Sequence, residues 1–134
     1  MLDACMQSLV GIVEATKSCT SISLVGLPFS FEGRLFNCAA IIGRGQIYGL
    51  VPKSEIPNSA EFYEKRWFST GINIQHASVA IGEHLNIPFG VDILFQSSVK
   101  DWMLGVEICE DLWSVIPPSS IQSINGANII ANLS

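Results

Sequence analysis

The residue best suited to covalent chemistry is Cys109, which ends an apolar stretch and begins the segment Cys109-Glu110-Asp111-Leu112-Trp113. A cysteine at the point where a buried strand meets a turn can present its sulfur as a nucleophile, as the serine does in a nucleophile elbow. The plainer interpretation is an inert, small apolar residue at a strand end. The acidic neighbours Glu107, Glu110 and Asp111 disfavour the thiolate, so a nucleophilic Cys109 needs a cation and a base from elsewhere in the fold.

Lys53 is the best candidate for that cation. It follows Val51-Pro52 at the end of another apolar stretch, where the proline fixes the local backbone, although a solvated loop lysine would look the same in sequence. Candidate bases or substrate-positioning carboxylates are Glu55, Glu61 and Glu64. The pair Glu61 and Glu64, followed by Lys65, is equally typical of one exposed helical turn.

Other reactive residue types form no recognisable constellation. The two histidines, His76 and His84, stand in unremarkable segments, so we assign neither a catalytic role. The four cysteines are widely spread, with no C-x-x-C pair and no histidine at ligand spacing. We therefore expect no metal site and no disulfide framework, and we expect reduced thiols in the cytoplasm.

The elements that must position these residues alternate between helix and strand. Apolar residues recur at helical spacing from Leu2 to about Ser18, and the polar, aromatic segment 52–71 is typical of a functional loop. Predicted strands lie at 21–29 (closed by Pro28), 35–43, 46–51, within 72–81, within 87–95 (ended by Pro88 and Gly90), at 102–109 and at 127–133. Segments 35–43 and 46–51 form a hairpin around Arg44-Gly45, and a short helix runs from Pro118 to Asn125 with Ser119 or Ser120 as N-cap. The fold class is therefore α/β with mixed sheets.

Composition narrows the class of protein further. The 134 residues are 49% hydrophobic and 14% charged, which excludes intrinsic disorder. Seven Lys and Arg against twelve Asp and Glu give a net charge of −5, so nucleic acid is not an expected partner. The uncharged stretch from Leu112 to Ser134 is broken by prolines and asparagines, so we expect no membrane span. The low charge, together with a chain that closes on an apolar strand, predicts a homo-oligomer or an internal piece of a larger domain.

Several motifs together resemble one known family. Three motifs carry the resemblance: V-P-K-S-E-I-P-N (51–58), E-F-Y-E-K-R-W-F (61–68) and V-E-I-C-E-D-L-W (106–113). They are similar to the glutaminase domains of the glutamine-dependent NAD⁺ synthetases, which belong to the nitrilase, or carbon–nitrogen hydrolase, superfamily. Shorter matches are V-G-L-P (25–28), L-F-N-C-A (35–39), I-P-F-G (87–90), P-P-S (117–119), G-A (126–127) and N-L-S (132–134).

The resemblance implies an α-β-β-α sandwich and a Glu–Lys–Cys triad. Cys109 matches the nucleophile that attacks the glutamine amide, and Lys53 matches the triad lysine that stabilises the oxyanion. The substrate-binding positions that it implies are Tyr63, Glu64, Glu110 and Ser134. In the family, the ammonia passes to a separate synthetase domain, which uses ATP and Mg²⁺ to amidate nicotinic acid adenine dinucleotide. The resemblance implies no cofactor for the 134 residues themselves.

Two departures from the family pattern qualify that picture. The triad glutamate lies upstream of the first helix in the family, and neither Glu14 nor Glu32 matches its context. The synthetase domain has no counterpart in this sequence. We therefore expect residues 1–134 to be a central fragment of the glutaminase domain, without glutamine turnover by itself. The alternatives are a stand-alone amidase of the nitrilase superfamily and a non-catalytic, nitrilase-like interaction module.

Overall fold

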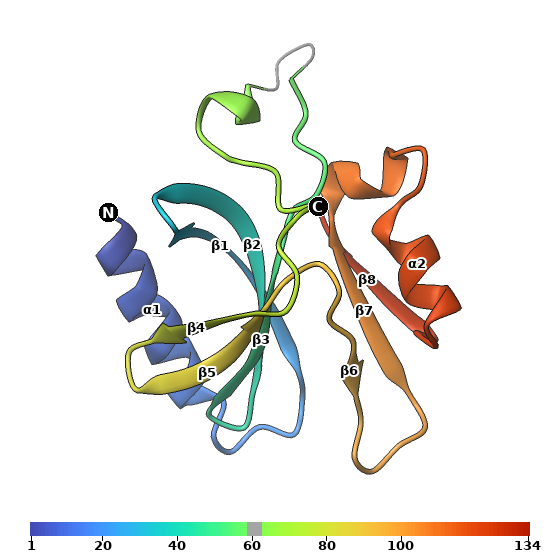
Figure 1. The fold of residues 1–134 in the computed structure, drawn as a ribbon. Helices are drawn as coiled ribbons and strands as arrows, with labels where there is room; N and C mark the ends of the chain where they lie inside the picture. Colours follow the sequence, from blue (N-terminus) through green and yellow to red (C-terminus); the bar gives the residue numbers. More distant parts are fainter. Residues whose placement is uncertain (59–62) are drawn as a thin grey trace.

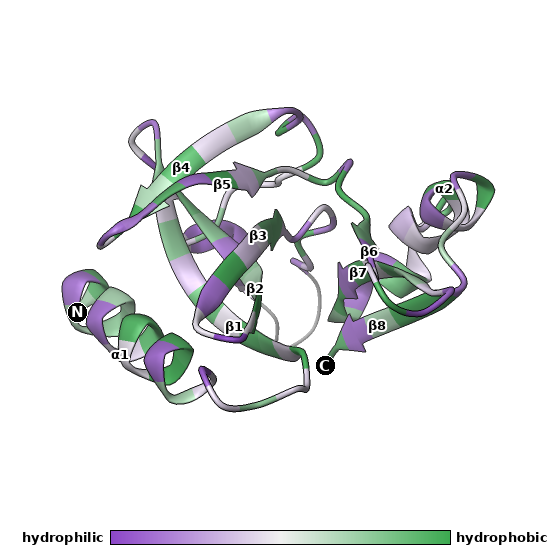
Figure 2. Ribbon diagram, turned by 90° about the horizontal axis from the view of Figure 1, so that it is seen from below, coloured by the Kyte–Doolittle hydropathy of each residue, from purple (hydrophilic) through white to green (hydrophobic). Residues whose placement is uncertain are grey.

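The structure is a computed structural model that describes residues 1–58 and 63–134, and it has four layers (Figures 1 and 2). Helix α1 (Leu2–Ala15) packs on the outer face of a five-stranded sheet, and helix α2 (Pro118–Ile124) packs on the outer face of a three-stranded sheet. The inner faces of the two sheets meet. This is the α-β-β-α sandwich that the family resemblance implies, and it agrees with the α/β class predicted from the order of elements.

Both sheets are mixed. The larger sheet has the order β1-β2-β3-β5-β4, and the smaller has the order β6-β7-β8. Pairs β3–β5 and β7–β8 are parallel and the others are antiparallel. The strands are β1 (Ser23–Phe31), β2 (Arg34–Gly43), β3 (Gln46–Pro52), β4 (Ala77–Ile81), β5 (His84–Phe89), β6 (Phe95–Gln96), β7 (Met103–Ile108) and β8 (Ile129–Leu133).

Strand β2 shows how the core is divided between the layers. It is an inner strand of the larger sheet, and its side chains alternate between two buried faces. Ala39 and Ile41 face Val106 and Ile108 of β7, while Cys38, Ala40 and Ile42 face the side covered by α1. Because both faces are buried, the strand reads as a continuous apolar run in the sequence.

An aromatic cluster curls the larger sheet. The Phe89 ring on β5 makes edge contacts with Phe29 and Phe31 of β1, at centroid distances of 5.5 and 5.2 Å, and with Phe36 of β2 at 5.9 Å. Since β1 and β5 are not neighbours in the sheet, the sheet must bend for their side chains to meet. The bend brings the β4–β5 hairpin against the apolar side of the sheet.

The predicted hairpin is confirmed, with Arg44 and Gly45 both at positive φ (53° and 74°), as a type I′ turn requires. Several predicted boundaries are wrong. Helix α1 ends at Ala15 rather than near Ser18. Strand β1 continues through Pro28, which an edge strand tolerates because it has an unpaired side.

Strand β5 begins at His84 and contains Pro88, whereas the sequence predicts a strand that starts near residue 87 and that Pro88 helps to end. The missing N–H of Pro88 is tolerated because β5 meets β3 at the single register pair Leu50–Phe89.

The predicted N-cap of α2 is also wrong. Pro117 occupies the N-cap position, and Pro118 is the first helical residue. The Glu107 carboxylate takes over the capping role, because its Oε2 accepts the backbone N–H of Ser119 at 3.1 Å. A serine side chain is therefore not needed to satisfy that donor.

Candidate active site

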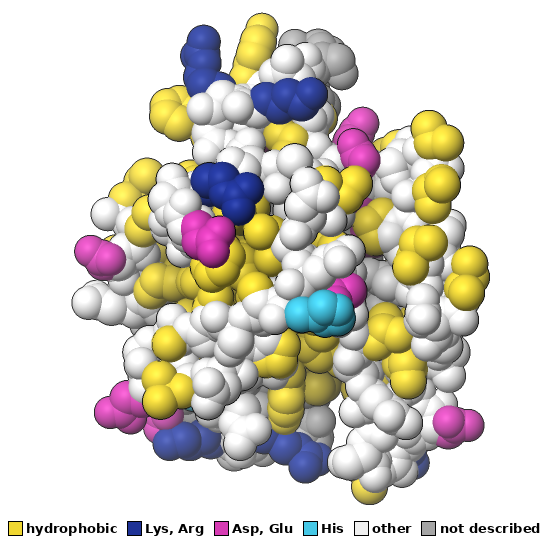
Figure 3. Space-filling view, in the orientation of Figure 1, with side chains coloured by type: hydrophobic (Ala, Val, Ile, Leu, Met, Phe, Trp, Pro, Cys, Tyr) yellow, Lys and Arg dark blue, Asp and Glu magenta, His cyan; other side chains and the backbone are white. Residues whose placement is uncertain are grey.

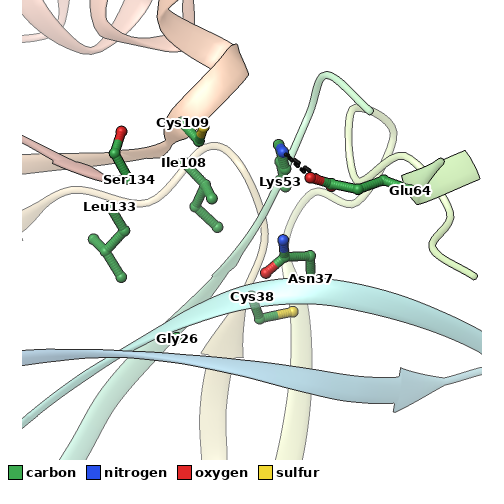
Figure 4. Close-up of a pocket in the computed structure, with 9 residues that line it drawn as sticks. All are labelled: Gly26, Asn37, Cys38, Lys53, Glu64, Ile108, Cys109, Leu133 and Ser134. Atoms are coloured by element: carbon green, nitrogen blue, oxygen red, sulfur yellow. Dashed lines mark hydrogen bonds and ion pairs between the residues drawn. The ribbon is translucent and has the colours of Figure 1, made fainter. Parts of the chain in front are cut away.

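Side chains from both sheets line a pocket of about 410 Å³ (Figure 4). Lys53 and Glu64 lie on one side of it, and Cys109 and Ser134 lie on the other. The other residues that line it are Gly26, Asn37, Cys38, Ile108 and Leu133. Four of the six residues predicted for the site therefore meet in one place, although 80 residues lie between the first and the last in the sequence.

The remaining two predicted residues lie outside this lining. Tyr63 directly precedes a short 3-10 helix, η1 (Glu64–Arg66), and is 65% exposed. Glu110 lies next to the nucleophile candidate in a second 3-10 helix, η2 (Cys109–Trp113), and is half-buried. Both are neighbours of pocket residues in the chain, but neither side chain lines the pocket.

Cys109 stands where β7 ends and η2 begins, with a φ of 48°. This left-handed conformation costs a non-glycine residue about 1 kcal/mol, so its surroundings must hold it. The Asn132 side chain of β8 does so, since its Oδ1 accepts the N–H of Cys109 at 3.2 Å and its Nδ2 donates to the Cys109 carbonyl at 3.3 Å. The cysteine is thus presented at a tight strand–turn junction, as the sequence predicts.

Lys53 is buried, with 1% of its surface exposed, rather than solvated. Its Nζ donates to both oxygens of Glu64 at 2.9 Å. Its backbone N–H donates to Asn37 O, and its carbonyl accepts the N–H of Gly71, both at 2.8 Å. The lysine head group is therefore held in place by its partner and by its own main chain.

Of the three candidate carboxylates, Glu64 is the one that reaches the pocket. Glu55 is exposed and lines a different hollow, beside α2. Glu61 lies outside the residues that the structure describes. Within the described lining of the pocket Glu64 is the single carboxylate, and both of its oxygens are engaged by Lys53.

Asp111, which in the sequence is only an acidic neighbour of Cys109, does not line the pocket but bonds to residues on both sides of it. Its side chain is 1% exposed. Oδ1 accepts the backbone N–H groups of Ser54 at 3.0 Å and Glu55 at 2.7 Å, and Oδ2 accepts the N–H of Ile108 at 2.9 Å. Burial raises the pKa of the Asp111 carboxyl, and these three donors and the charge of Lys53 oppose the rise. An acidic residue in the first turn of a helix commonly accepts the N–H of the residue that precedes the helix, so the bond to Ile108 could be expected from the sequence. No feature of the sequence indicates the bonds to Ser54 and Glu55.

Glu107 and Asn132 form a second buried network behind Cys109. Asn132 Nδ2 donates to Glu107 Oε1 at 3.2 Å, and Glu107 is 1% exposed. Ser134 joins the network, since its Oγ donates to Asn132 Oδ1 at 2.8 Å. The network connects the nucleophile candidate to β8 and to the start of α2.

The four cysteines are all free, and they differ strongly in exposure. Cys19 is exposed, Cys5 and Cys109 are half-buried, and Cys38 is fully buried in the pocket wall. Burial raises the pKa of the Cys38 thiol, which makes it a poor nucleophile although it lies in the same pocket.

Two further observations concern metal ligands and membrane-spanning helices among the described residues. Among the residues that the structure describes, no three His, Cys, Asp or Glu side chains gather closely enough to hold a metal ion. Within residues 1–58 and 63–134, no helix combines the length and the apolar character needed to cross a bilayer.

Comparison of the fold with solved structures indicates the class of protein. The chain superimposes on a carbon–nitrogen hydrolase from Helicobacter pylori G27 with a TM-score of 0.70 and 23% identity, over 99% of this chain and 40% of the other. The architecture is thus a nitrilase-like sandwich, present here as a partial domain.

Within that class, the chain matches glutamine-dependent NAD⁺ synthetases along its whole length. It is 38% identical to the Mycobacterium leprae enzyme over 135 residues, which is 100% of this chain and 20% of the relative. It is 28% identical to the human enzyme over 136 residues, 96% of this chain and 19% of the relative. The solved synthetase from Cytophaga hutchinsonii aligns with a TM-score of 0.74 and 28% identity, over 96% of this chain and 20% of that one.

These comparisons confirm the resemblance seen in the sequence motifs. The chain spans about a fifth of the length of the curated relatives it matches. No family model matches the chain.

Proposed function

We propose that this chain supplies the cysteine and lysine of a glutamine-hydrolysing site, which feeds ammonia to a synthetase domain within a larger polypeptide. The observation that carries the proposal is the pocket itself, in which the Cys109 turn and the buried Lys53–Glu64 ion pair face each other from different sheets. The relatives that match 96–100% of this chain are named for glutamine dependence, which supports glutamine as the substrate.

In the proposed reaction, the Cys109 sulfur attacks the side-chain amide carbon of glutamine. The carbon–nitrogen bond breaks, the thiol proton goes to the departing nitrogen, and ammonia leaves a glutamyl thioester. Water then attacks the thioester, which releases glutamate and restores the thiol. The Lys53 ammonium donates a hydrogen bond to the oxyanion that forms in each step, in a pocket where burial strengthens the interaction.

The proposal requires a general base that the described pocket does not provide. Glu64 is committed to Lys53 through both oxygens, and the neighbouring carboxylates Glu107 and Asp111 are committed to backbone and amide donors. Because the family resemblance places the triad glutamate upstream of the first helix, we propose that a carboxylate preceding residue 1 in the parent protein completes the triad. The isolated chain is accordingly expected to have no glutaminase turnover.

We assign the use of ATP and Mg²⁺ to a separate domain. The sequence has no glycine-rich phosphate loop, and no metal-binding cluster exists among the described residues. The residues present do not fit either group, so no step of the proposed reaction involves them. The partners of this chain are then glutamine and the domain that accepts ammonia, and we also propose that the parent protein forms a homo-oligomer in the cytoplasm.

A segment exchange tests this function directly. The 134 residues replace the 135-residue matching segment of the Mycobacterium leprae relative, and the chimera is assayed with glutamine or with added ammonium as nitrogen source. We expect both activities in the chimera. Cys109→Ala and Lys53→Met should remove the glutamine-dependent activity and leave the ammonium-dependent activity intact.

The matched control is Cys19→Ser, which alters an exposed thiol that does not line the pocket and should change neither activity. A chimera that uses ammonium but not glutamine would contradict the proposal. Preferential labelling of Cys5, Cys19 or Cys38 over Cys109 by a reactive glutamine analogue would also contradict the proposal.

Of the alternatives, a non-catalytic interaction module is disfavoured by the buried ion pair. Burying a lysine is costly, and a module without chemistry has no need to place a buried Lys53–Glu64 pair in the same pocket as a free thiol. A stand-alone amidase would share the pocket but not the full-length match to the synthetases.

A further inference from the structure

The Asp111 carboxylate bonds at once to the loop that carries Lys53 and to the turn that carries Cys109. Ser54 and Glu55 directly follow Lys53, and both donate their N–H groups to Asp111 Oδ1. Ile108 directly precedes Cys109 and donates to Asp111 Oδ2. One side chain thus fixes the main chain next to both reactive groups, across 56 and 57 positions of sequence on the Lys53 side.

The bonds to Ser54 and Glu55 are not needed to form the turn. A carboxylate that only capped η2 would need the bond to Ile108 and could leave its other oxygen in water. Here both oxygens are removed from water, at 1% exposure, and the cost of that burial is offset by three main-chain donors. The geometry therefore serves a connection between two segments.

We propose that Asp111 is a positioning residue that sets the distance between the Lys53 ammonium and the Cys109 thiol. This inference rests on the proposed function, in which the two groups act on one substrate. The loop is also held by main-chain bonds from Lys53 to Asn37 and Gly71, by the Thr70 hydroxyl, which donates to the Ser54 carbonyl, and by the Lys53–Glu64 ion pair, and none of these bonds reaches the cysteine. Besides the apolar packing between the sheets, Asp111 links the β7 side of the pocket to the β3 side by hydrogen bonds.

The test measures the alkylation rate of each cysteine by iodoacetamide with mass mapping, in the 134-residue chain near neutral pH. Cys19 is exposed and serves as the internal standard, while Cys38 is buried and reports loss of the fold. The variants are Asp111→Asn, Lys53→Met and the double variant. Asp101→Asn is the matched control, because Asp101 is an exposed residue and the charge change is the same.

We expect Asp111→Asn to slow the labelling of Cys109 on the order of tenfold relative to Cys19, because displacement of the lysine withdraws its charge from the thiol. Loss of the Asp111 charge alone would act in the opposite direction, since removing a nearby anion favours the thiolate. Faster labelling of Cys109 would therefore overturn the proposal. The double variant should label no more slowly than Lys53→Met, because Asp111 acts through the lysine. If the slowing of Cys109 labelling in the two single variants were additive in the double variant, Asp111 would not act through Lys53, and the proposal would be overturned.

Amide hydrogen exchange of the unsubstituted chain provides a second measurement, which is decisive if Asp111→Asn exposes Cys38. The Ser54 and Glu55 amides should be protected together with Ile108, although Glu55 lies at the exposed surface. Exchange of Ser54 and Glu55 at the rate of free loop amides would overturn the proposal. This measurement does not involve glutamine. A failed segment exchange would therefore contradict the proposed function without affecting the interpretation of the exchange rates.

Discussion

The Lys53–Glu64 ion pair leads to a prediction about which partner is more costly to remove. The lysine is almost completely buried, whereas the glutamate side chain is 24% exposed. Glu64→Gln would leave an ammonium in the interior with one weaker, neutral acceptor in place of two charged ones. Lys53→Met would remove the buried charge and leave a carboxylate that can turn toward water.

The burial of the two partners sets the magnitudes. Removing one partner of a buried pair costs about 3–5 kcal/mol when the other is left without compensation. Because the Asp111 charge still acts on Lys53, we place Glu64→Gln at the lower end, about 3 kcal/mol. Lys53→Met should cost about 1–2 kcal/mol, since Glu64 regains water and the methionine fills the stem volume. The double variant should cost about the same as Lys53→Met, which corresponds to a coupling energy of about 3 kcal/mol.

Urea unfolding measures these free energies without screening the pair by salt, and the three tryptophans provide the fluorescence signal. Glu83→Gln, in the turn between β4 and β5, is the matched control and should stay within about 0.5 kcal/mol of the unsubstituted chain. The reasoning is refuted if Lys53→Met costs as much as Glu64→Gln or if the two losses simply add.

Three further predictions follow from the packing and the charges. A Cβ on Gly105 would lie 2.3 Å from Gln122 Oε1, so Gly105→Ala should cost about 1–3 kcal/mol by displacing α2 from β7, as measured by urea unfolding; a neutral result would mean that Gln122 can move aside freely. Truncating Phe89, the centre of the aromatic cluster, to Ala should cost about 3–5 kcal/mol in the same assay, and a loss below 1 kcal/mol would show that the curled sheet does not depend on it. The pKa of Asp111 is raised in the folded state from 3.8, so the folded chain binds this proton more tightly than the unfolded chain, and the contribution of this group to the free energy of unfolding should fall as pH rises from about 3.8 through the folded pKa. Unfolding titrations of Asp111→Asn should lack that component, and an identical pH dependence in both chains would contradict it.

Exposed apolar side chains around α2 add a prediction about association. Val115, Ile116 and Ile124 are 101%, 68% and 81% exposed, and hydrophobic side chains gather on the side of the molecule where α2 lies (Figure 3). We expect the chain to self-associate through this surface, and Ile116→Lys with Ile124→Lys to shift light scattering toward the monomer. Unchanged scattering would place the contact elsewhere.

The order of elements and the strand ends that carry Lys53 and Cys109 could be predicted from the sequence because their signals are local. Alternating or continuous apolar runs define the strands, and the junctions at Lys53 and Cys109 follow directly from where those runs end. The strand ends predicted at Pro28 and Pro88 were wrong, because a missing N–H ends a strand only where a neighbouring strand would have accepted that N–H. The role of Pro28 depends on β1 being an edge strand, which is a property of the whole sheet.

The supporting residues could not be predicted, because their roles depend on contacts between distant segments. Asp111 and Asn132 are ordinary polar residues in the sequence, and no spacing indicates the bonds from Asp111 to Ser54 and Glu55 or from Asn132 to Cys109. Asp111 reaches Ser54 and Asn132 reaches Cys109 only after the two sheets have packed together. The burial of Lys53 could not be predicted for the same reason, because a loop lysine becomes an interior residue only through contacts with distant segments.

The division of the pocket between two sheets has a consequence for the order of folding. The β2–β3 hairpin that carries Lys53 is closed by near neighbours and can form early, whereas Cys109 reaches it only after a loop of more than 50 residues has closed. The thiol and the ammonium therefore come together late, when docking of the sheets completes the long-range contacts. In a refolding experiment, protection of the buried Cys38 should precede the arrival of Cys109 at its final reactivity, so this pair of thiols would time hairpin burial and sheet docking as separate events.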